Sequence, residues 1–171
     1  MQIPWKKTTL AFGIPVLLAV FGPTVSASTA MPLSGTFRAT IAPVGSRSAD
    51  GNTIISFTFM ETFTGTMSGT RVGAGTLLVH PDGTLDVRDA GLFTGTIGAA
   101  SGTATITGVG AGVFASFAGR FRVSEGSGGL AGLHASGSFK GSATGPVSFA
   151  GTYSGQAHVR GESGQVQPSD E

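Results

Sequence analysis

The residues after position 30 alternate in short runs between apolar and polar side chains, and this pattern restricts the fold more than any other feature of the sequence. In 34–42, Phe37 and Ile41 share one face while Arg38 and Thr40 share the other. Successive side chains of a β-strand point to opposite faces of a sheet, so such a run is typical of a half-buried strand. We find no apolar stripe of helical period in this part of the sequence. The pattern therefore predicts an all-β domain.

Turn residues separate these runs, and His80-Pro81-Asp82-Gly83 is a strong turn signal. The predicted strands are 34–42, 53–64, 72–80, 84–88, 91–97, 102–108, 112–123, 132–140 and 147–159. Many short strands joined by turns predict an antiparallel barrel or sandwich. We favour a closed antiparallel barrel of about eight strands, because closure removes exposed strand edges. Only 11% of the residues are charged, so few side chains are present to protect such edges.

Composition excludes several classes of protein. The 29 Gly show no three-residue period and only 8 Pro accompany them, which excludes a collagen-like chain. The sequence contains no Cys, so disulfides, thiol catalysis and thiolate metal sites are excluded. The formal net charge is +1, and Lys6-Lys7 is the only basic cluster. We therefore expect no nucleic-acid partner.

The N-terminal segment has the pattern of a cleavable secretory signal. Two lysines precede the apolar run 10–20, and small residues follow it. Cleavage after Ala27 and cleavage after Ala30 fit the pattern equally well. The alternative is a retained N-terminal anchor, but the apolar run is short for a membrane span, and Pro15 and Pro23 interrupt it.

The sequence therefore divides into three parts. Residues 1–30 are assigned to the signal peptide, 31–159 to the β-barrel domain and 160–171 to a polar tail that we expect to be disordered. The expected location is secreted or periplasmic, with no stable membrane span once the signal is removed.

Three segments of the domain carry a resemblance to a known family. They are Glu61-Thr62-Phe63-Thr64-Gly65, Gly91-Leu92-Phe93-Thr94-Gly95-Thr96, and Gly126-Ser127-Gly128-Gly129-Leu130-Ala131-Gly132-Leu133 followed by Gly137-Ser138-Phe139. With them the chain resembles an uncharacterised bacterial family of small proteins, whose β-barrel is like that of allene oxide cyclases and plant dirigent proteins. The resemblance covers roughly residues 34–155 and implies an eight-stranded antiparallel barrel with no assigned reaction.

The chain departs from that family at one pair of positions. Family members often carry Glu-Arg before the second Phe-Thr-Gly, where this chain has Gly91 and Leu92. A polar interior that depends on that pair is therefore not transferred to this protein. The earlier carboxylate, Glu61, is retained.

Glu61 is the predicted catalytic residue. In the run 53–64 it shares a face with Phe57, Phe59 and Phe63, which should be the inside of the barrel. A carboxylate among phenylalanine rings is costly to ionise, so we expect its pKa to rise unless a cation pairs with it. Such a group suits a general acid or base, or an anchor for a ligand. The alternative is a buried structural pair, or a glutamate at the rim of the barrel.

A ligand-binding set follows from the same face. We predict that Phe57, Phe59 and Phe63 contact a ligand, together with Tyr153, the only tyrosine of the chain. The alternative for Tyr153 is a core ring with its hydroxyl at the rim. Arg120 and Arg122 alternate to the outer face, and Arg38 does the same.

We expect neither a metal site nor a cofactor. His80, His134 and His158 are not spaced as metal ligands. The aspartates at 50, 82, 86 and 89 lack the ligand density of a calcium loop and are interpreted as solvated turn residues.

Three functions fit the predicted barrel. The first is a module that binds a small hydrophobic ligand inside it. The second is a cyclase- or isomerase-like enzyme of the allene-oxide-cyclase type, which holds a reactive substrate in one conformation with help from a carboxylate or a bound water. The third is a structural or surface protein with a filled barrel. Whether the protein is an enzyme, which ligand it takes and how it oligomerises stay open at this level.

Overall fold

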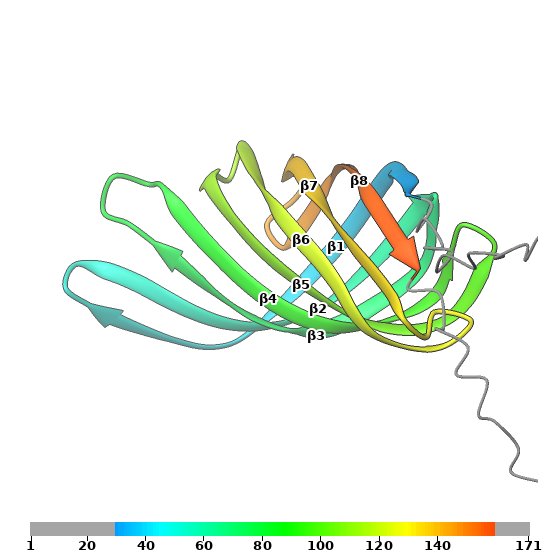
Figure 1. Ribbon diagram of the computed structural model, residues 1–171. Helices are drawn as coiled ribbons and strands as arrows, with labels where there is room; N and C mark the ends of the chain where they lie inside the picture. Colours follow the sequence, from blue (N-terminus) through cyan, green and yellow to red (C-terminus); the bar gives the residue numbers. More distant parts are fainter. Residues whose placement is uncertain (1–29, 160–171) are drawn as a thin grey trace, which may run out of the picture.

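The computed structural model describes residues 30–159, which form an all-β structure (Figure 1). Eight antiparallel strands make a closed ring in which each strand pairs with the next and the last pairs with the first. The strands are β1 (Met31–Ala49), β2 (Asn52–Gly65), β3 (Met67–Val79), β4 (Leu85–Ile97), β5 (Ala100–Val113), β6 (Ser116–Gly128), β7 (Leu133–Ala143) and β8 (Ser148–Val159). The predicted all-β antiparallel fold is confirmed. The predicted signal peptide and tail lie outside the described residues, apart from residue 30.

The strands are longer than predicted, and several predicted breaks are wrong. The segment 43–52, predicted as a loop, is largely the second half of β1, with a bulge between Pro43 and Gly45. The predicted strands 84–88 and 91–97 form one continuous β4, and β5 runs through the predicted break at 109–110. Conversely, the predicted strand 112–123 contains the turn between β5 and β6.

Many glycines lie inside strands and make room for rings, and one of them explains an error. Gly110, in the predicted break at 109–110, lies within β5, where an added Cβ would come within 3.0 Å of the Phe139 ring. Phe59 lies directly opposite Gly73, and a Cβ placed on Gly73 would come within 2.8 Å of its ring. Phe121 likewise lies directly opposite Gly137, and a Cβ placed on Gly137 would come within 2.7 Å of the Phe121 ring. In a small barrel, large inward residues must face small ones on neighbouring strands. The high glycine content is therefore explained by packing inside the barrel as well as by turns.

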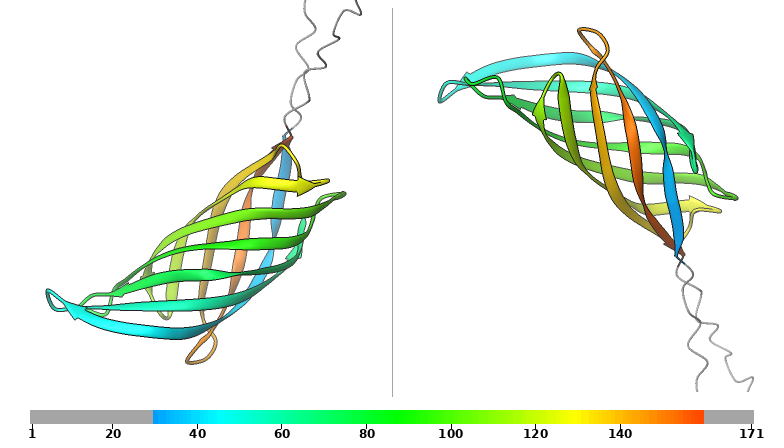
Figure 2. Two further views of the ribbon diagram at one scale, coloured as in Figure 1. Left: turned by 90° about the horizontal axis from the view of Figure 1, so that it is seen from below. Right: turned by 90° about the horizontal axis from the view of Figure 1, so that it is seen from above.

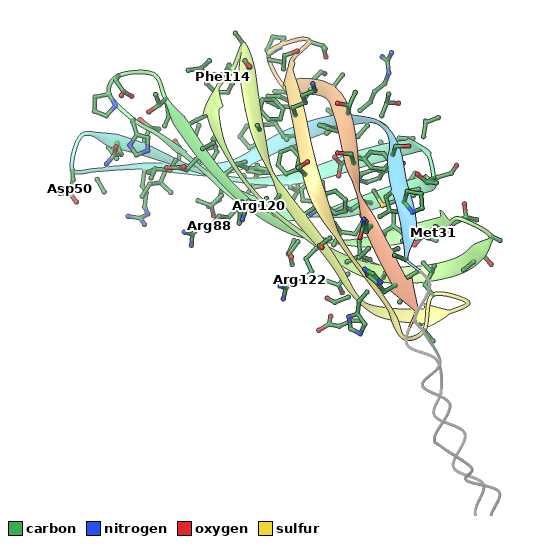
Figure 3. The ribbon with its side chains drawn as sticks, turned by 45° about the horizontal axis from the view of Figure 1, so that its top comes forward. Met31, Asp50, Arg88, Phe114, Arg120 and Arg122 are labelled. Carbon is green, nitrogen blue, oxygen red and sulfur yellow. The ribbon has the colours of Figure 1, made fainter. Side chains whose placement is uncertain are left out.

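Inward and outward side chains alternate along the ring as predicted for a half-buried sheet. Along β2 the residues at odd positions from 57 to 63 are buried and their neighbours are exposed. The side chains of Arg88, Arg120 and Arg122 project from the outer face (Figure 3). Arg38 is also exposed, so its predicted outward orientation is confirmed, as are those of Arg120 and Arg122.

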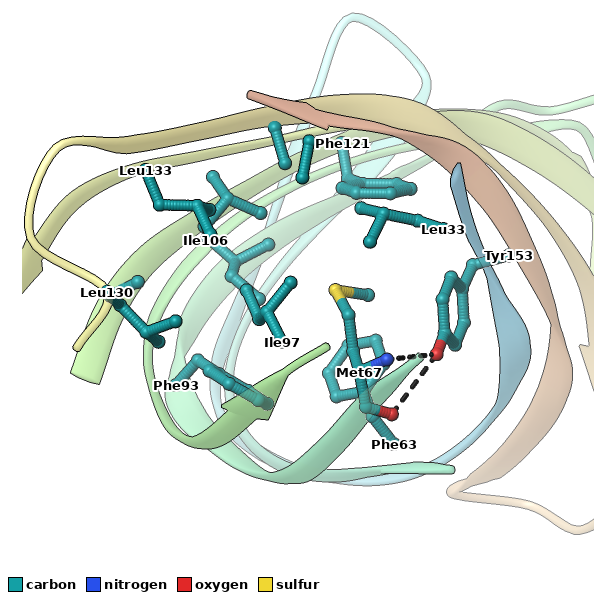
Figure 4. Packing of buried hydrophobic residues seen from close by; sticks show 14 of the residues in the cluster. Leu33, Phe63, Met67, Phe93, Ile97, Ile106, Phe121, Leu130, Leu133 and Tyr153 are labelled. Atoms are coloured by element: carbon teal, nitrogen blue, oxygen red, sulfur yellow. Dashed lines mark hydrogen bonds between the residues drawn. The ribbon is translucent and has the colours of Figure 1, made fainter. Parts of the chain in front are cut away.

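Strand β1 begins and β8 ends at the same end of the barrel (Figure 2). This end is closed by a packed hydrophobic cluster (Figure 4). Its fully buried members include Phe93, Met67 and Leu130. The cluster consists of Leu33, Phe37, Phe63, Met67, Phe93, Ile97, Ala104, Ile106, Phe121, Val123, Leu130, Leu133, Ala135, Tyr153 and Ala157. The barrel therefore has a solid base.

At the opposite end the hairpins β1–β2 and β3–β4 project beyond the other strands (Figure 1). A second, smaller cluster of Phe57, Phe59, Leu77 and Leu85 lines the inner face of this region. The two hairpins are joined by the His80 ring, whose Nδ1 lies 2.9 Å from Asn52 Oδ1 while its Nε2 lies 3.0 Å from Asp86 Oδ2. Within residues 30–159 there is no helix of the length and apolarity needed to cross a membrane.

Candidate functional site

Three charged side chains meet inside the barrel on adjacent strands. Glu61 on β2 lies directly opposite Arg71 on β3, and both residues are buried. Asp89 comes from β4, where it pairs in register with Gly75 and Gly108. The side chains of Arg71, Glu61 and Asp89 are 6%, 11% and 17% exposed. We call these three residues the interior charged cluster.

Arg71 holds the cluster together. Its Nη1 donates a hydrogen bond of 2.9 Å to Glu61 Oε2, and its Nη2 donates both to Asp89 Oδ1 and to the Ile106 carbonyl oxygen, the latter at 2.9 Å. The guanidinium carbon also lies 4.6 Å from the centroid of the Phe59 ring, within the range of a cation–π interaction. One cation thus links strands β2, β3, β4 and β5.

The cluster retains unpaired polar atoms. Arg71 Nε is buried without a hydrogen-bond partner in the described part of the chain. Within the same residues, the Glu61 carboxylate accepts a hydrogen bond through Oε2 only, which leaves Oε1 free. Native proteins seldom leave buried polar groups unpaired, and those that do so often have a functional role.

Burial raises the pKa of the Glu61 carboxyl above its usual range. The neighbouring Arg71 acts in the opposite direction, but it does not outweigh the loss of hydration, and Asp89 adds a further small increase. The pKa of Glu61 is therefore raised although a cation pairs with it, whereas the sequence predicted a rise only without such a cation. Perturbed carboxyls of this kind are common in functional sites.

A cavity of about 120 Å³ lies beside the cluster, and its wall is largely aromatic. Nine of the ten phenylalanines in residues 30–159 line it, together with Tyr153. The lining also includes the three charged residues and several aliphatic side chains. Phe114 belongs to this lining, is 41% exposed and lies in the turn between β5 and β6 (Figure 3). The cavity therefore reaches from the interior charged cluster toward the end of the barrel that carries this turn.

All five residues predicted for the site line this cavity: Glu61, Phe57, Phe59, Phe63 and Tyr153. The Tyr153 hydroxyl is engaged by the start of β3, because it accepts a hydrogen bond of 2.8 Å from the Met67 amide and lies 3.1 Å from the Met67 carbonyl oxygen (Figure 4). Tyr153 thus offers the cavity its ring, while its hydroxyl fixes the backbone of β3.

The sequence interpretation missed two members of the cluster. Arg71 fell in a segment predicted as a connection, whereas β3 begins at Met67. The interpretation of Asp89 as a solvated turn residue is wrong, because it lies on the inner face of β4 and pairs with Arg71. The available signal was the turn at Gly65-Thr66, since a hairpin centred on Thr66 places Glu61 opposite Arg71.

The histidines form no comparable site. His134 and His158 are exposed and lie opposite each other on the outer face of β7 and β8. His80 contacts Asn52 and Asp86 at the hairpin tips. In the described part of the chain, no group of three or more His, Asp or Glu side chains is arranged to bind a metal ion.

The described residues define a small antiparallel barrel with an aromatic cavity and an interior charged cluster. The fold is similar to the crystal structure of a protein of unknown function from the DUF3224 family of Shewanella oneidensis MR-1. The TM-score is 0.59 at 14% sequence identity, over 74% of this chain and 97% of that one. At this identity the similarity concerns the fold. No family model and no curated protein matches the sequence.

This neighbour is in keeping with the predicted resemblance to uncharacterised bacterial proteins. The likeness to allene oxide cyclases and dirigent proteins stays a prediction, as does secretion.

Proposed function

We propose that the barrel binds a small hydrophobic ligand in the aromatic cavity, with one end of the ligand against the interior charged cluster. The cavity carries this proposal, because its apolar wall ends at a few polar groups, as ligand pockets commonly do. Its volume of about 120 Å³ suits a group near the size of a benzene ring. An engineered apolar cavity of about 150 Å³ in another protein binds benzene.

Several observations support binding over a purely structural role. A filled barrel would contain neither a cavity nor an unpaired carboxylate oxygen. In this barrel a cavity lies beside Glu61, and within residues 30–159 one oxygen of the Glu61 carboxylate accepts no hydrogen bond. The packed base also contains fully buried residues that do not line the cavity, among them Phe93, Met67 and Leu130, so the core does not depend on the cavity wall alone.

Glu61 also favours a second candidate, an enzyme of the cyclase or isomerase kind. Its raised pKa and its free oxygen in a cavity suit a general acid or base. In this alternative the barrel holds a reactive substrate, as in the allene-oxide-cyclase type. Chemical conversion of a captured ligand, lost in Glu61→Gln, distinguishes the enzyme from the binding module.

We further propose that the protein is exported through its N-terminal signal and acts in the periplasm or outside the cell.

Filling the cavity tests the binding function. Ala39 lines the cavity directly opposite Glu61, so Ala39→Phe places a ring in the space proposed for the ligand. We expect at least about tenfold weaker binding of 2-phenylethanol, measured by calorimetry, which corresponds to a decrease of about 1.4 kcal/mol or more in binding free energy. The smaller Ala39→Leu, which perturbs folding less, should weaken binding in the same direction.

Thr40→Phe is the matched control, because Thr40 is adjacent in sequence and exposed on the outer face. Unchanged binding is expected for this variant. If Ala39→Phe and Ala39→Leu both bind the probe as the parent protein does, the ligand site is elsewhere. Native mass spectrometry of the protein taken from its own host should in addition show a bound molecule that Ala39→Phe lacks.

A further inference from the structure

We infer that the ligand is a cation, namely a hydrophobic amine whose ammonium group lies against Glu61 and whose apolar part fills the aromatic cavity. This inference rests on the proposed binding function and names the chemical class of its ligand.

The first step is the charge of the site. The cavity lining contains two carboxylates, Glu61 and Asp89, and one guanidinium, Arg71. When both carboxylates are ionised, the lining thus carries one negative charge in excess. Charges removed from water must be paired, or they destabilise the structure. A ligand with a single positive charge would neutralise the site.

The second step is the pattern of hydrogen-bonding groups. Arg71 Nη2 already donates hydrogen bonds to Asp89 and to a backbone carbonyl, and Nη1 donates one to Glu61. Arg71 Nε is unpaired but has almost no accessible surface, so a ligand does not reach it without displacing the side chain. The available groups are acceptors, namely Glu61 Oε1 and Asp89 Oδ2, neither of which accepts a hydrogen bond within residues 30–159. An ammonium group has three donors and no acceptor, so it is complementary to these oxygens.

These contacts disfavour an anionic ligand. A carboxylate placed at the cluster would face two carboxylates and a guanidinium whose donors are largely occupied. Like charges at close range raise the energy of the complex, the more so where water is excluded. A neutral alcohol donates to Glu61 but leaves the excess charge uncompensated.

The third step is the aromatic wall. The faces of aromatic rings carry partial negative charge and attract cations, which is how many proteins bind ammonium ligands. The cavity already contains one example, since Arg71 stacks on Phe59. Phe57 and Phe63 line the same space on the same strand as Glu61. A cation held by Glu61 would thus be surrounded by rings of favourable polarity.

Three probes of similar shape test the inference: 2-phenylethylamine, 2-phenylethanol and phenylacetate. We expect the parent protein, studied by calorimetry at neutral pH and low salt, to bind the amine at least about tenfold more tightly than the alcohol, because the amine forms a charged hydrogen bond. Phenylacetate should bind most weakly. Glu61→Gln should remove the preference for the amine and retain binding of the alcohol, which also shows that the variant is folded.

Glu125→Gln is the matched control, because it makes the same chemical change at an exposed position on β6. It should leave the preference for the amine unchanged. The inference is overturned if the parent protein binds the alcohol or the carboxylate as tightly as the amine, or if Glu61→Gln keeps the preference. Equal binding of all three probes refutes the cationic ligand alone, whereas binding of none refutes the proposed function as well.

Discussion

Arg71→Met lowers the free energy of unfolding by about 3–5 kcal/mol, because it leaves two buried carboxylates without their cation. Arg71 also joins Glu61, Asp89 and the backbone of β5, so its removal weakens the links among four neighbouring strands. Urea unfolding at neutral pH measures the effect. The destabilisation should become smaller as the pH is lowered, since protonation removes the charge of the two carboxyls.

Arg120→Met is the control for this prediction, because Arg120 is exposed on the outer face of the barrel (Figure 3). A surface substitution of this kind changes stability by less than about 0.5 kcal/mol. Adding Glu61→Gln and Asp89→Asn to the Arg71→Met protein should restore part of the stability, because no buried charge then remains. Equal effects of the two arginine substitutions would show that the interior charged cluster is not a buried unit.

Phe93→Ala should destabilise the protein by about 3–5 kcal/mol, the usual cost of removing a fully buried phenylalanine ring. The residue is 0% exposed and packs edge to face on Phe63, with ring centroids 5.9 Å apart. The ring is part of the packed base of the barrel (Figure 4) and is absent from the cavity lining. The variant, below its unfolding transition, should therefore still bind 2-phenylethanol.

The adjacent Leu92→Ala provides the matched comparison. Leu92 points outward and is 51% exposed, so its truncation should change stability by less than about 0.5 kcal/mol. If the two substitutions have similar effects, the assignment of the inner and outer faces of β4 is wrong. If Phe93→Ala abolishes probe binding while folded, the Phe93 ring is needed to shape the cavity through its contact with Phe63, and the expectation is wrong.

The alternation along β2 was sufficient to predict that Glu61 faces inward among phenylalanines, since a strand offers only two faces. It was not sufficient to identify the partner of Glu61. That partner depends on the register of β2 and β3, which is set by the turn at Gly65-Thr66. The glycines after this turn suggested a connection, and Arg71 was missed for that reason.

Asp89 illustrates a second limit. It follows a Pro-Asp-Gly turn and one further aspartate, Asp86, a context typical of solvated loops. Its inward orientation depends on the continuity of β4 across residues 89 and 90, which lie between the predicted strands 84–88 and 91–97. The pairing of glycines with rings across strands is a property of the closed ring. A single sequence does not show which glycines bend a chain and which accommodate a side chain.

The titration of the Glu61 carboxyl in the folded protein is the most direct test of a ligand cavity beside a buried carboxylate. Its ¹³C NMR signal, assigned through its absence in Glu61→Gln, is followed against pH with and without 2-phenylethylamine. We expect a midpoint above the usual range of glutamate in the free protein, because burial raises the pKa of Glu61.

Stability linked to Glu61 should accordingly be present below its unfolded pKa and be lost as the pH rises through the folded pKa. The amine should lower the midpoint, because an adjacent ammonium favours the ionised carboxylate. A midpoint in the usual range or below it, unchanged by the amine, would contradict both the burial of Glu61 and its place in a ligand site.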